Sequence, residues 1–340
     1  MNRKMLTLLA VPLVAVALAI SAAAIVPGLQ KTLAQGPLAT SVAAPAWAVG
    51  DRWTYNVSMA ALAEADVLPR EMIPDPTMPA EAFFAGALTE TVAGSVSTEY
   101  GAAWNVTLDG RFGSGIPRPI IMSAPTVQAA STPGVTLTGF LWLRQSDLAP
   151  VYTLKTVHLD RNWTVPPVLT GAYGMEANAT YRLTCDATTQ VWYRPALGLW
   201  SFPLRENATW NASTNATIRY ASTFRVVGPN VTYEAAHFAN FTVPVRFSLR
   251  AGVFETVTTP AGAFRALPVS PVQASLQAAV PDRDASAVMN LTGDADVEMP
   301  HAFATAWFSA TAGNVVKATF WSGPFVGPRL EMDLVSYTYT

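Results

Sequence analysis

A chain of 340 residues is long enough for two ordinary domains or for one large β domain. Charged residues make up only 13% of it, about half the usual share in soluble domains, while apolar residues make up 51%. The net charge of −2 excludes electrostatic capture of nucleic acid, which needs clustered positive charge. A chain so poor in charge must be kept in solution by attached sugar, by a membrane tether or by association with a partner.

The N-terminus has the pattern of an export signal. Met1–Lys4 is a short basic segment, and an uncharged stretch from Met5 to Gln30 follows it. The apolar part of this stretch is also about as long as a bilayer-spanning helix of about 20 residues. Residues 1–35 are therefore predicted to be a signal peptide or an N-terminal membrane anchor with its basic end inside. We expect the rest of the chain to lie outside the cell, with membrane contact only through this segment.

The remaining chain is predicted to be mainly β. Residues 36–46 are expected to be a linker. An Ala-rich helix is expected to begin near Asp75-Pro76 and to end near Leu88, and a second helical turn, bounded by prolines, is expected within 271–280. Strand-like segments are predicted at 52–59, 89–97, 102–109, 135–143, 151–159, 178–186, 189–194, 216–227, 230–235, 239–249, 253–259, 263–269, 304–309, 315–321 and 330–339.

A weak internal repeat divides the chain. Trp192 and Trp307 each lie beside another aromatic residue, and each precedes a glycine by six positions, Gly198 and Gly313. Both segments are typical of hairpins whose turn needs glycine. The predicted fold is therefore two related β units, 47–220 and 221–340, built from long curved antiparallel sheets as a half-barrel or sandwich, with one or two short helices.

Asparagine-linked glycosylation is the sharpest functional signal. The sequence has twelve asparagines, and ten of them open an Asn-x-Ser/Thr sequon without an intervening proline. Only Asn2 and Asn314 do not. The predicted acceptors are Asn56, Asn105, Asn162, Asn178, Asn207, Asn211, Asn215, Asn230, Asn240 and Asn290.

The strand phase supports this interpretation. In the segment around Asn56, Trp53, Tyr55 and Val57 alternate with the asparagine, and the same alternation surrounds Asn105. Because successive strand side chains point to opposite faces, these asparagines are expected on a solvated face of an antiparallel sheet.

No group of residues has the pattern of an active site or a metal site. The single cysteine, Cys185, excludes an intramolecular disulfide, and its phase predicts a buried, inert thiol. The histidines His158, His237 and His301 lack metal-ligand spacing. The Gly-rich segment 110–115 lacks the strand–helix context of a phosphate loop. No cofactor is predicted.

One acidic segment and the many aromatic residues leave alternatives open. Acidic residues within 282–298 could hold Ca²⁺ outside the cell, although their spacing is not that of an EF-hand and favours a solvated loop. The 10 Trp, 10 Tyr and 15 Phe lie largely on the apolar strand phase. They would fill the core of a sandwich or line the concave sheet of a half-barrel that binds a lipid.

The C-terminal third carries a set of short motifs: Glu255–Phe264, then Trp307-Phe308-Ser309 with Gly313 and Lys317, and a closing strand around Tyr337. With these segments it resembles a family of exported domains of unknown function that occur in bacteria and archaea. The motif residues are Pro260, Ala261, Gly262, Phe264, Trp307, Phe308, Gly313 and Lys317. The resemblance implies a long curved antiparallel sheet similar to the half-barrel of lipoprotein carriers, and it implies no catalytic residue. Trp47–Tyr55 also looks like the start of archaeal surface proteins, while a eukaryotic secretory origin stays open.

Three functions are consistent with these features. The first is a non-enzymatic, glycosylated cell-surface scaffold that serves envelope structure or interaction, with cell-envelope proteins as partners. The second is a carrier that binds a lipid or another hydrophobic ligand in its curved sheet. The third is an extracellular hydrolase, which would need carboxylates or histidines brought together by the fold.

Overall fold

The computed structural model describes residues 41–61, 82–114, 134–164, 178–229, 232–276, 297–298, 304–321 and 328–339. The predicted signal or anchor, Asn230, Asn290 and His301 lie outside these residues, as does the acidic segment apart from the short strand at 297–298. In the described part of the chain, no helix has the length and apolarity that a membrane crossing requires.

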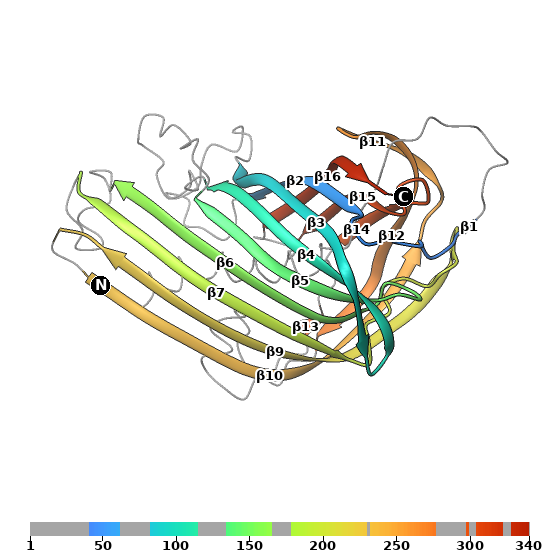
Figure 1. The fold of residues 1–340 in the computed structure, drawn as a ribbon, viewed down its shortest axis with the longest axis horizontal. Helices are drawn as coiled ribbons and strands as arrows, with labels where there is room; N and C mark the ends of the chain where they lie inside the picture. The colour runs from blue at the N-terminus through green and yellow to red at the C-terminus, as the bar shows by residue number, and fades with distance from the viewer. Residues whose placement is uncertain are drawn as a thin grey trace.

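The described residues form strands joined by turns and irregular segments (Figure 1). The strands are β1 (Ser41–Val42), β2 (Arg52–Ala61), β3 (Ala82–Thr98), β4 (Gly101–Ser114), β5 (Val135–Arg144), β6 (Pro150–Thr164), β7 (Thr180–Arg194), β8 (Leu204–Arg205), β9 (Thr209–Val227), β10 (Thr232–Ala251), β11 (Glu255–Thr259), β12 (Gly262–Leu276), β13 (Val297–Glu298), β14 (Ala304–Ser309), β15 (Asn314–Trp321) and β16 (Pro328–Thr338).

Twelve of the described strands form one closed antiparallel barrel. Their order is β10-β9-β7-β6-β5-β4-β3-β2-β16-β15-β14-β12, and β10 pairs with β12 to close the ring. The closing contact joins Val245–Ala251 of β10 to Val269–Leu276 of β12. Strands β11 and β13 also pair with β12, while β1 and β8 form a separate two-stranded sheet. The fold is therefore mainly β and antiparallel as predicted, but the predicted half-barrel or sandwich is not confirmed.

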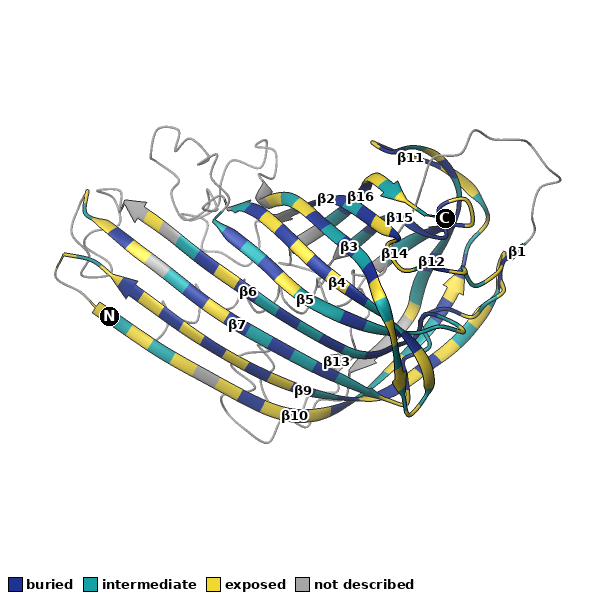
Figure 2. Cartoon of the chain, in the orientation of Figure 1, coloured by how far each residue is buried: buried dark blue, intermediate teal, exposed yellow. Residues whose placement is uncertain are grey.

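Alternation along the long strands separates an inner face from an outer face. Along β9, from Ala212 to Val226, buried even-numbered residues alternate with odd-numbered residues that are mostly exposed. Figure 2 shows this alternation as bands along β7, β9 and β10. The largest cluster of buried apolar side chains draws on strands around the ring and includes Trp53, Phe112 and Phe308. A second cluster on the same inner face joins β7, β9 and β10. The buried face is therefore the inside of the barrel.

The predicted helices are wrong where the structure describes the chain. Ala82–Leu88 belongs to β3, which pairs with β2 on one side and with β4 on the other. Two flanking strands satisfy the backbone of this Ala-rich segment, so pairing overrides its helical propensity. Residues 271–276 belong to β12, and Pro271 lies at the register shift between Ser248 and Leu249 of β10. A bulge is a position where a sheet tolerates proline.

Several predicted boundaries also differ from the structure. Position 220, where the sequence divides the two β units, lies inside β9, so the sheet continues across it. Within the predicted linker, Ser41 and Val42 pair with β8, and Val42 is buried in the core. The repeat is a hairpin only at Gly313, between β14 and β15. Gly198 instead follows β7 in an irregular segment.

Candidate functional site: the outer face and the sequons

Among the sequon asparagines that the structure describes, those on strands lie on the outer face of the barrel, and Asn178 and Asn207 lie in turns. Seven of the eight that the structure describes are exposed, and the eighth, Asn105, is half-buried. Asn178 and Asn207 lie in turns with φ of 59° and 58°, a region that asparagine tolerates better than most residues. The predicted solvent-facing position is therefore confirmed for the exposed strand asparagines, while Asn105 is only half-buried. Attachment of sugar to any of them stays a prediction.

Strand register places three sequons around one patch of the outer face. Asn105 of β4 pairs with Trp142 of β5, and the row continues through Tyr152 of β6 and Trp192 of β7. Beyond Trp192 the row reaches Thr217 of β9 and Thr242 of β10, the hydroxyl residues of the Asn215 and Asn240 sequons. The two hydroxyls lie 2.8 Å apart, within hydrogen-bond distance.

The middle of this row is aromatic. The ring centroids of Trp142 and Tyr152 lie 5.0 Å apart, and those of Tyr152 and Trp192 lie 5.1 Å apart. Phe140 also contacts Trp142 and Tyr152. The guanidinium of Arg219 lies 5.0 Å from the centroid of Trp192, at cation–π distance. We call Phe140, Trp142, Tyr152 and Trp192 the aromatic row. Its four side chains are half-buried on the outer face, and Trp142 also packs against a small buried cluster of Ala149, Val151 and Ala196.

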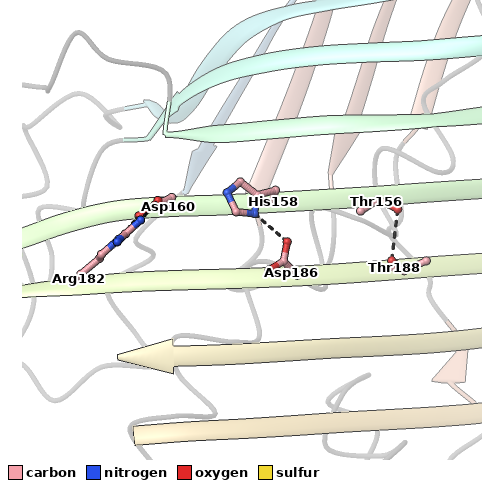
Figure 3. A network of polar contacts seen from close by, with 6 residues as sticks. All are labelled: Thr156, His158, Asp160, Arg182, Asp186 and Thr188. Carbon is pink, nitrogen blue, oxygen red and sulfur yellow. Dashed lines mark hydrogen bonds and ion pairs between the residues drawn. The ribbon is translucent and has the colours of Figure 1, made fainter. Parts of the chain in front are cut away.

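A polar ladder continues along the same face of β6 and β7 (Figure 3). The Thr156 and Thr188 hydroxyls lie 3.3 Å apart, and His158 Nδ1 lies 2.7 Å from an Asp186 carboxylate oxygen. At the next step Arg182 donates two hydrogen bonds to Asp160, which lower the pKa of that carboxyl group. The pairs join neighbouring positions of the two strands. The His158–Asp186 and Arg182–Asp160 pairs are exposed to solvent and therefore add little to stability. His158, which has no metal-ligand spacing in the sequence, is an exposed surface residue.

The strand β10 has a partly unpaired edge. Thr232–Arg250 of β10 pairs with β9, but only Val245–Ala251 pairs with β12. In the described part of the chain, Thr232–Pro244 has no strand on its second side. Unpaired strand edges are sites where another chain can add, and proteins protect them with proline, charge or cover.

A second polar group lies inside the barrel, and the sequence interpretation missed it. Lys155 of β6 is 1% exposed, and its Nζ has no hydrogen-bond partner among the described residues. A row across the inner face runs from Glu90 through Leu108 and Gly139 to Lys155. Gly139 has no side chain, and a methyl group there would overlap the Leu154 carbonyl oxygen on β6, so the two strands approach closely beside Lys155. Lys155 shares its strand phase with Val151, Val157 and Leu159, and this was the signal in the sequence.

The electrostatics of this interior group follow from its burial. Desolvation lowers the pKa of Lys155 to about 7, and the nearby Glu90 opposes this shift. Burial, with a smaller contribution from Glu90, raises the pKa of Tyr55 well above its usual value. The Tyr55 hydroxyl also has no hydrogen-bond partner among the described residues. An amine that is partly neutral near pH 7 could pair with an acidic ligand or react with a carbonyl.

The single cysteine is buried as predicted. Cys185 is 6% exposed, and burial raises the pKa of its thiol to about 11. A thiol is nucleophilic only as the thiolate, so this environment keeps Cys185 unreactive at neutral pH. Within the described residues, no group of three or more His, Cys, Asp or Glu side chains is placed to hold a metal ion.

The predicted motif residues shape turns and packing. Pro260, Ala261 and Gly262 form the turn between β11 and β12, where Gly262 has a φ of 131°. The Ala261 amide donates a hydrogen bond of 3.0 Å to the Leu334 carbonyl oxygen on β16. Phe264 is buried and meets Tyr337 edge to face.

The second half of the motif has the same kind of role. Trp307 donates a hydrogen bond from its indole nitrogen to Glu255, and Phe308 is fully buried. Gly313 has a φ of 64° in the turn after β14, and Lys317 forms an ion pair of 3.2 Å with Asp333. Each described contact of the motif supports the fold, and none forms a cleft with a reactive group.

Comparison with known proteins gives one distant structural likeness. No protein-family model matches the chain, and no curated protein matches it. A crystal structure from Bacteroides fragilis, described as a "putative exported protein with YmcC-like fold", aligns over 88% of this chain and 99% of its own. The two sequences are 12% identical and the TM-score is 0.31, which is below the level of a shared fold.

Proposed function

We propose that this chain is an exported, N-glycosylated and non-enzymatic β protein of the cell surface, where it serves as a scaffold in the envelope or for interaction. The observation that carries the proposal is the outward position of the sequons. Ten of twelve asparagines open a sequon, and seven of the eight described acceptors are exposed on strands or turns. Sugar on that face would supply the hydration that a chain with only 13% charged residues lacks.

The N-terminal segment supports export, because it combines a basic start with a long uncharged stretch. Extracellular location, a retained or cleaved signal and envelope-protein partners all form part of the proposal. The non-enzymatic role draws support from the described outer face, where the His158–Asp186 and Arg182–Asp160 pairs are exposed and bond to each other across two strands.

Site-by-site glycopeptide mass spectrometry of the protein from its own host tests the proposal. Two results together would support it: sugar on most of the sequons, and either removal of the N-terminal signal or retention of the protein in the membrane. Unmodified asparagines throughout would refute the glycoprotein proposal. Hydrolysis of a cell-wall polymer by the purified protein would refute the non-enzymatic role.

A second candidate function is a carrier for a lipid or another hydrophobic molecule. The observation that favours it is the unpartnered amine of Lys155 within the apolar barrel interior. An amphipathic ligand with an acidic group would satisfy that amine and the surrounding apolar surface together. Native mass spectrometry without detergent tests this candidate: a lipid-sized mass released on denaturation would support it, and a ligand-free chain would refute it.

A further inference from the structure

The outer face pairs its predicted glycan acceptors with exposed aromatic surface. Phe238 is 65% exposed, although the rest of the outer face of β10 is largely polar. It lies two residues before Asn240 on the same strand, so both side chains point to the same face about 6.6 Å apart along the strand. The exposed phenyl ring thus adjoins the atom to which a sugar would be attached.

Two further residues adjoin Asn240 on this face. Arg219 is its cross-strand neighbour on β9, and its guanidinium stacks over Trp192 of the aromatic row. Thr242 completes the sequon and is fixed by its hydrogen bond with Thr217. A sugar on Asn240 would meet an apolar ring on one side and hydrogen-bonding groups on the other.

Asn105 has an equivalent environment at the opposite end of the aromatic row. Its cross-strand neighbour is Trp142, the first indole of the row. The amide oxygen of Asn105 is buried and has no hydrogen-bond partner among the described residues. Buried acceptors without a donor are costly in folded proteins. The side chain of Asn105 thus lies close against the sheet, beside its cross-strand neighbour Trp142.

We infer that the first sugars of the glycans on Asn105 and Asn240 lie flat on the sheet, over Trp142 and Phe238 respectively. One ring face of a pyranose carries several C–H bonds, and it packs against aromatic rings while its hydroxyls face polar neighbours. The aromatic row and Phe238 are then a built-in carbohydrate-binding surface for the sugars of the same chain. This inference rests on the proposed glycosylation and adds where the sugars bind and what holds them.

The chain provides a matched control in the Asn56 sequon. Asn56 is exposed on the outer face of β2, and its strand neighbours are Thr54 and Ser58. Its cross-strand neighbours are Ala87 and Asp333. No aromatic side chain adjoins it in these directions, so a sugar on Asn56 should be free in solvent.

The test uses the full chain secreted by a eukaryotic host that adds oligomannose N-glycans. Glycopeptide mass spectrometry first gives the occupancy of Asn56, Asn105 and Asn240. The native protein is then treated with a peptide N-glycosidase, and the release rate is followed at each site. We expect release at Asn105 and Asn240 to be about two- to tenfold slower than at Asn56, the factor that corresponds to one aromatic stacking contact.

Substitutions assign this protection to individual rings. Trp142→Ala should accelerate release at Asn105 only, and Phe238→Ala should accelerate release at Asn240 only. Phe238→Leu keeps an apolar side chain without the ring, and it should also accelerate release. Denaturation should make all three rates equal. Rates at Asn105 and Asn240 that do not respond to these substitutions would overturn the inference, whereas bare asparagines in the native host would refute the proposed glycosylation instead.

Discussion

Replacement of Lys155 by Met should change how the stability of the barrel depends on pH. Met has nearly the same length as Lys and no charge, so Lys155→Met removes the buried amine and retains most of the packing. The pKa of Lys155 is lowered from 10.5 to about 7 by burial. Between these two values the unfolded chain carries a proton on Lys155 that the folded protein largely lacks.

The sign and size of the effect follow from proton linkage. Where the unfolded state binds more protons, the free energy of unfolding rises with pH, by up to about 1.4 kcal/mol per pH unit for one group. Lys155 is half protonated in the folded protein at about pH 7 and almost neutral at pH 8.5. Its titration should therefore stabilise the wild-type protein by about 2 kcal/mol from pH 7 to pH 8.5. Below pH 7 the full cost of burying the charged amine remains.

The assay is urea unfolding of both proteins at pH 6, 7, 7.75 and 8.5, and the result is the difference between the two free energies. This difference cancels groups that titrate alike in both proteins, such as the histidines. From pH 7 to pH 8.5, the free energy of unfolding of wild type should rise by about 2 kcal/mol relative to that of Lys155→Met. Lys317→Met, which removes a lysine in a half-buried ion pair with Asp333, controls for loss of a surface charge.

Glu90 provides an internal check because its charge raises the pKa of Lys155. Glu90→Gln should move the rise in stability to lower pH. Comparison of Glu90→Gln with the double variant Glu90→Gln/Lys155→Met isolates the contribution of the lysine to that rise. Tyr55, the other titratable group near Glu90, has a pKa well above the range of the assay. Parallel stability curves for wild type and Lys155→Met would refute the description of Lys155 as a buried amine.

Three further predictions concern the core, a strand glycine and the thiol. Phe308→Ala should lower the free energy of unfolding by about 3–5 kcal/mol, because the fully buried ring packs edge to face against Trp200 and Phe202; a loss in chemical denaturation of less than 1 kcal/mol would contradict this packing. Gly139→Ala should destabilise the barrel by more than an ordinary surface change, because its methyl group would overlap the Leu154 carbonyl oxygen on β6; an unchanged melting temperature would contradict that close approach. Cys185 should resist iodoacetamide at pH 8 in the folded protein and react once urea unfolds it, because its thiol is buried with a pKa of about 11; equal labelling rates in both states would contradict its burial.

Local alternation explains which parts of the structure could be predicted from the sequence. The outward position of Asn56, Asn215 and Asn240 and the burial of Cys185 depend only on the period of two along a strand. Ala82–Leu88 was misassigned because a run of small residues carries helical propensity and no alternating pattern. Its strand form depends on partners on both sides, which sequence periodicity does not reveal.

The two candidate sites differ in what the sequence could show. The sequons are local motifs, and each can be identified from three residues. The aromatic row is assembled from β5, β6 and β7 by cross-strand register. The inner row from Glu90 to Lys155 spans the four strands from β3 to β6. Register between strands that are distant in sequence is set by the whole sheet, so no short window predicts it. Only the unusual phase of Lys155 among Val151, Val157 and Leu159 could have indicated the interior group.

The unpaired edge of β10 connects the proposed sugar to the solubility of the fold. Thr232–Pro244 has backbone groups on one side that no described strand satisfies, and an edge of this length invites the addition of a second chain. Pro244 removes one donor, and Glu234 places a charge near the other end. Between them the exposed Phe238 would favour association, and Asn240 is the acceptor beside it. Under the proposed function, a glycan at Asn240 would therefore cover the ring and obstruct the edge together.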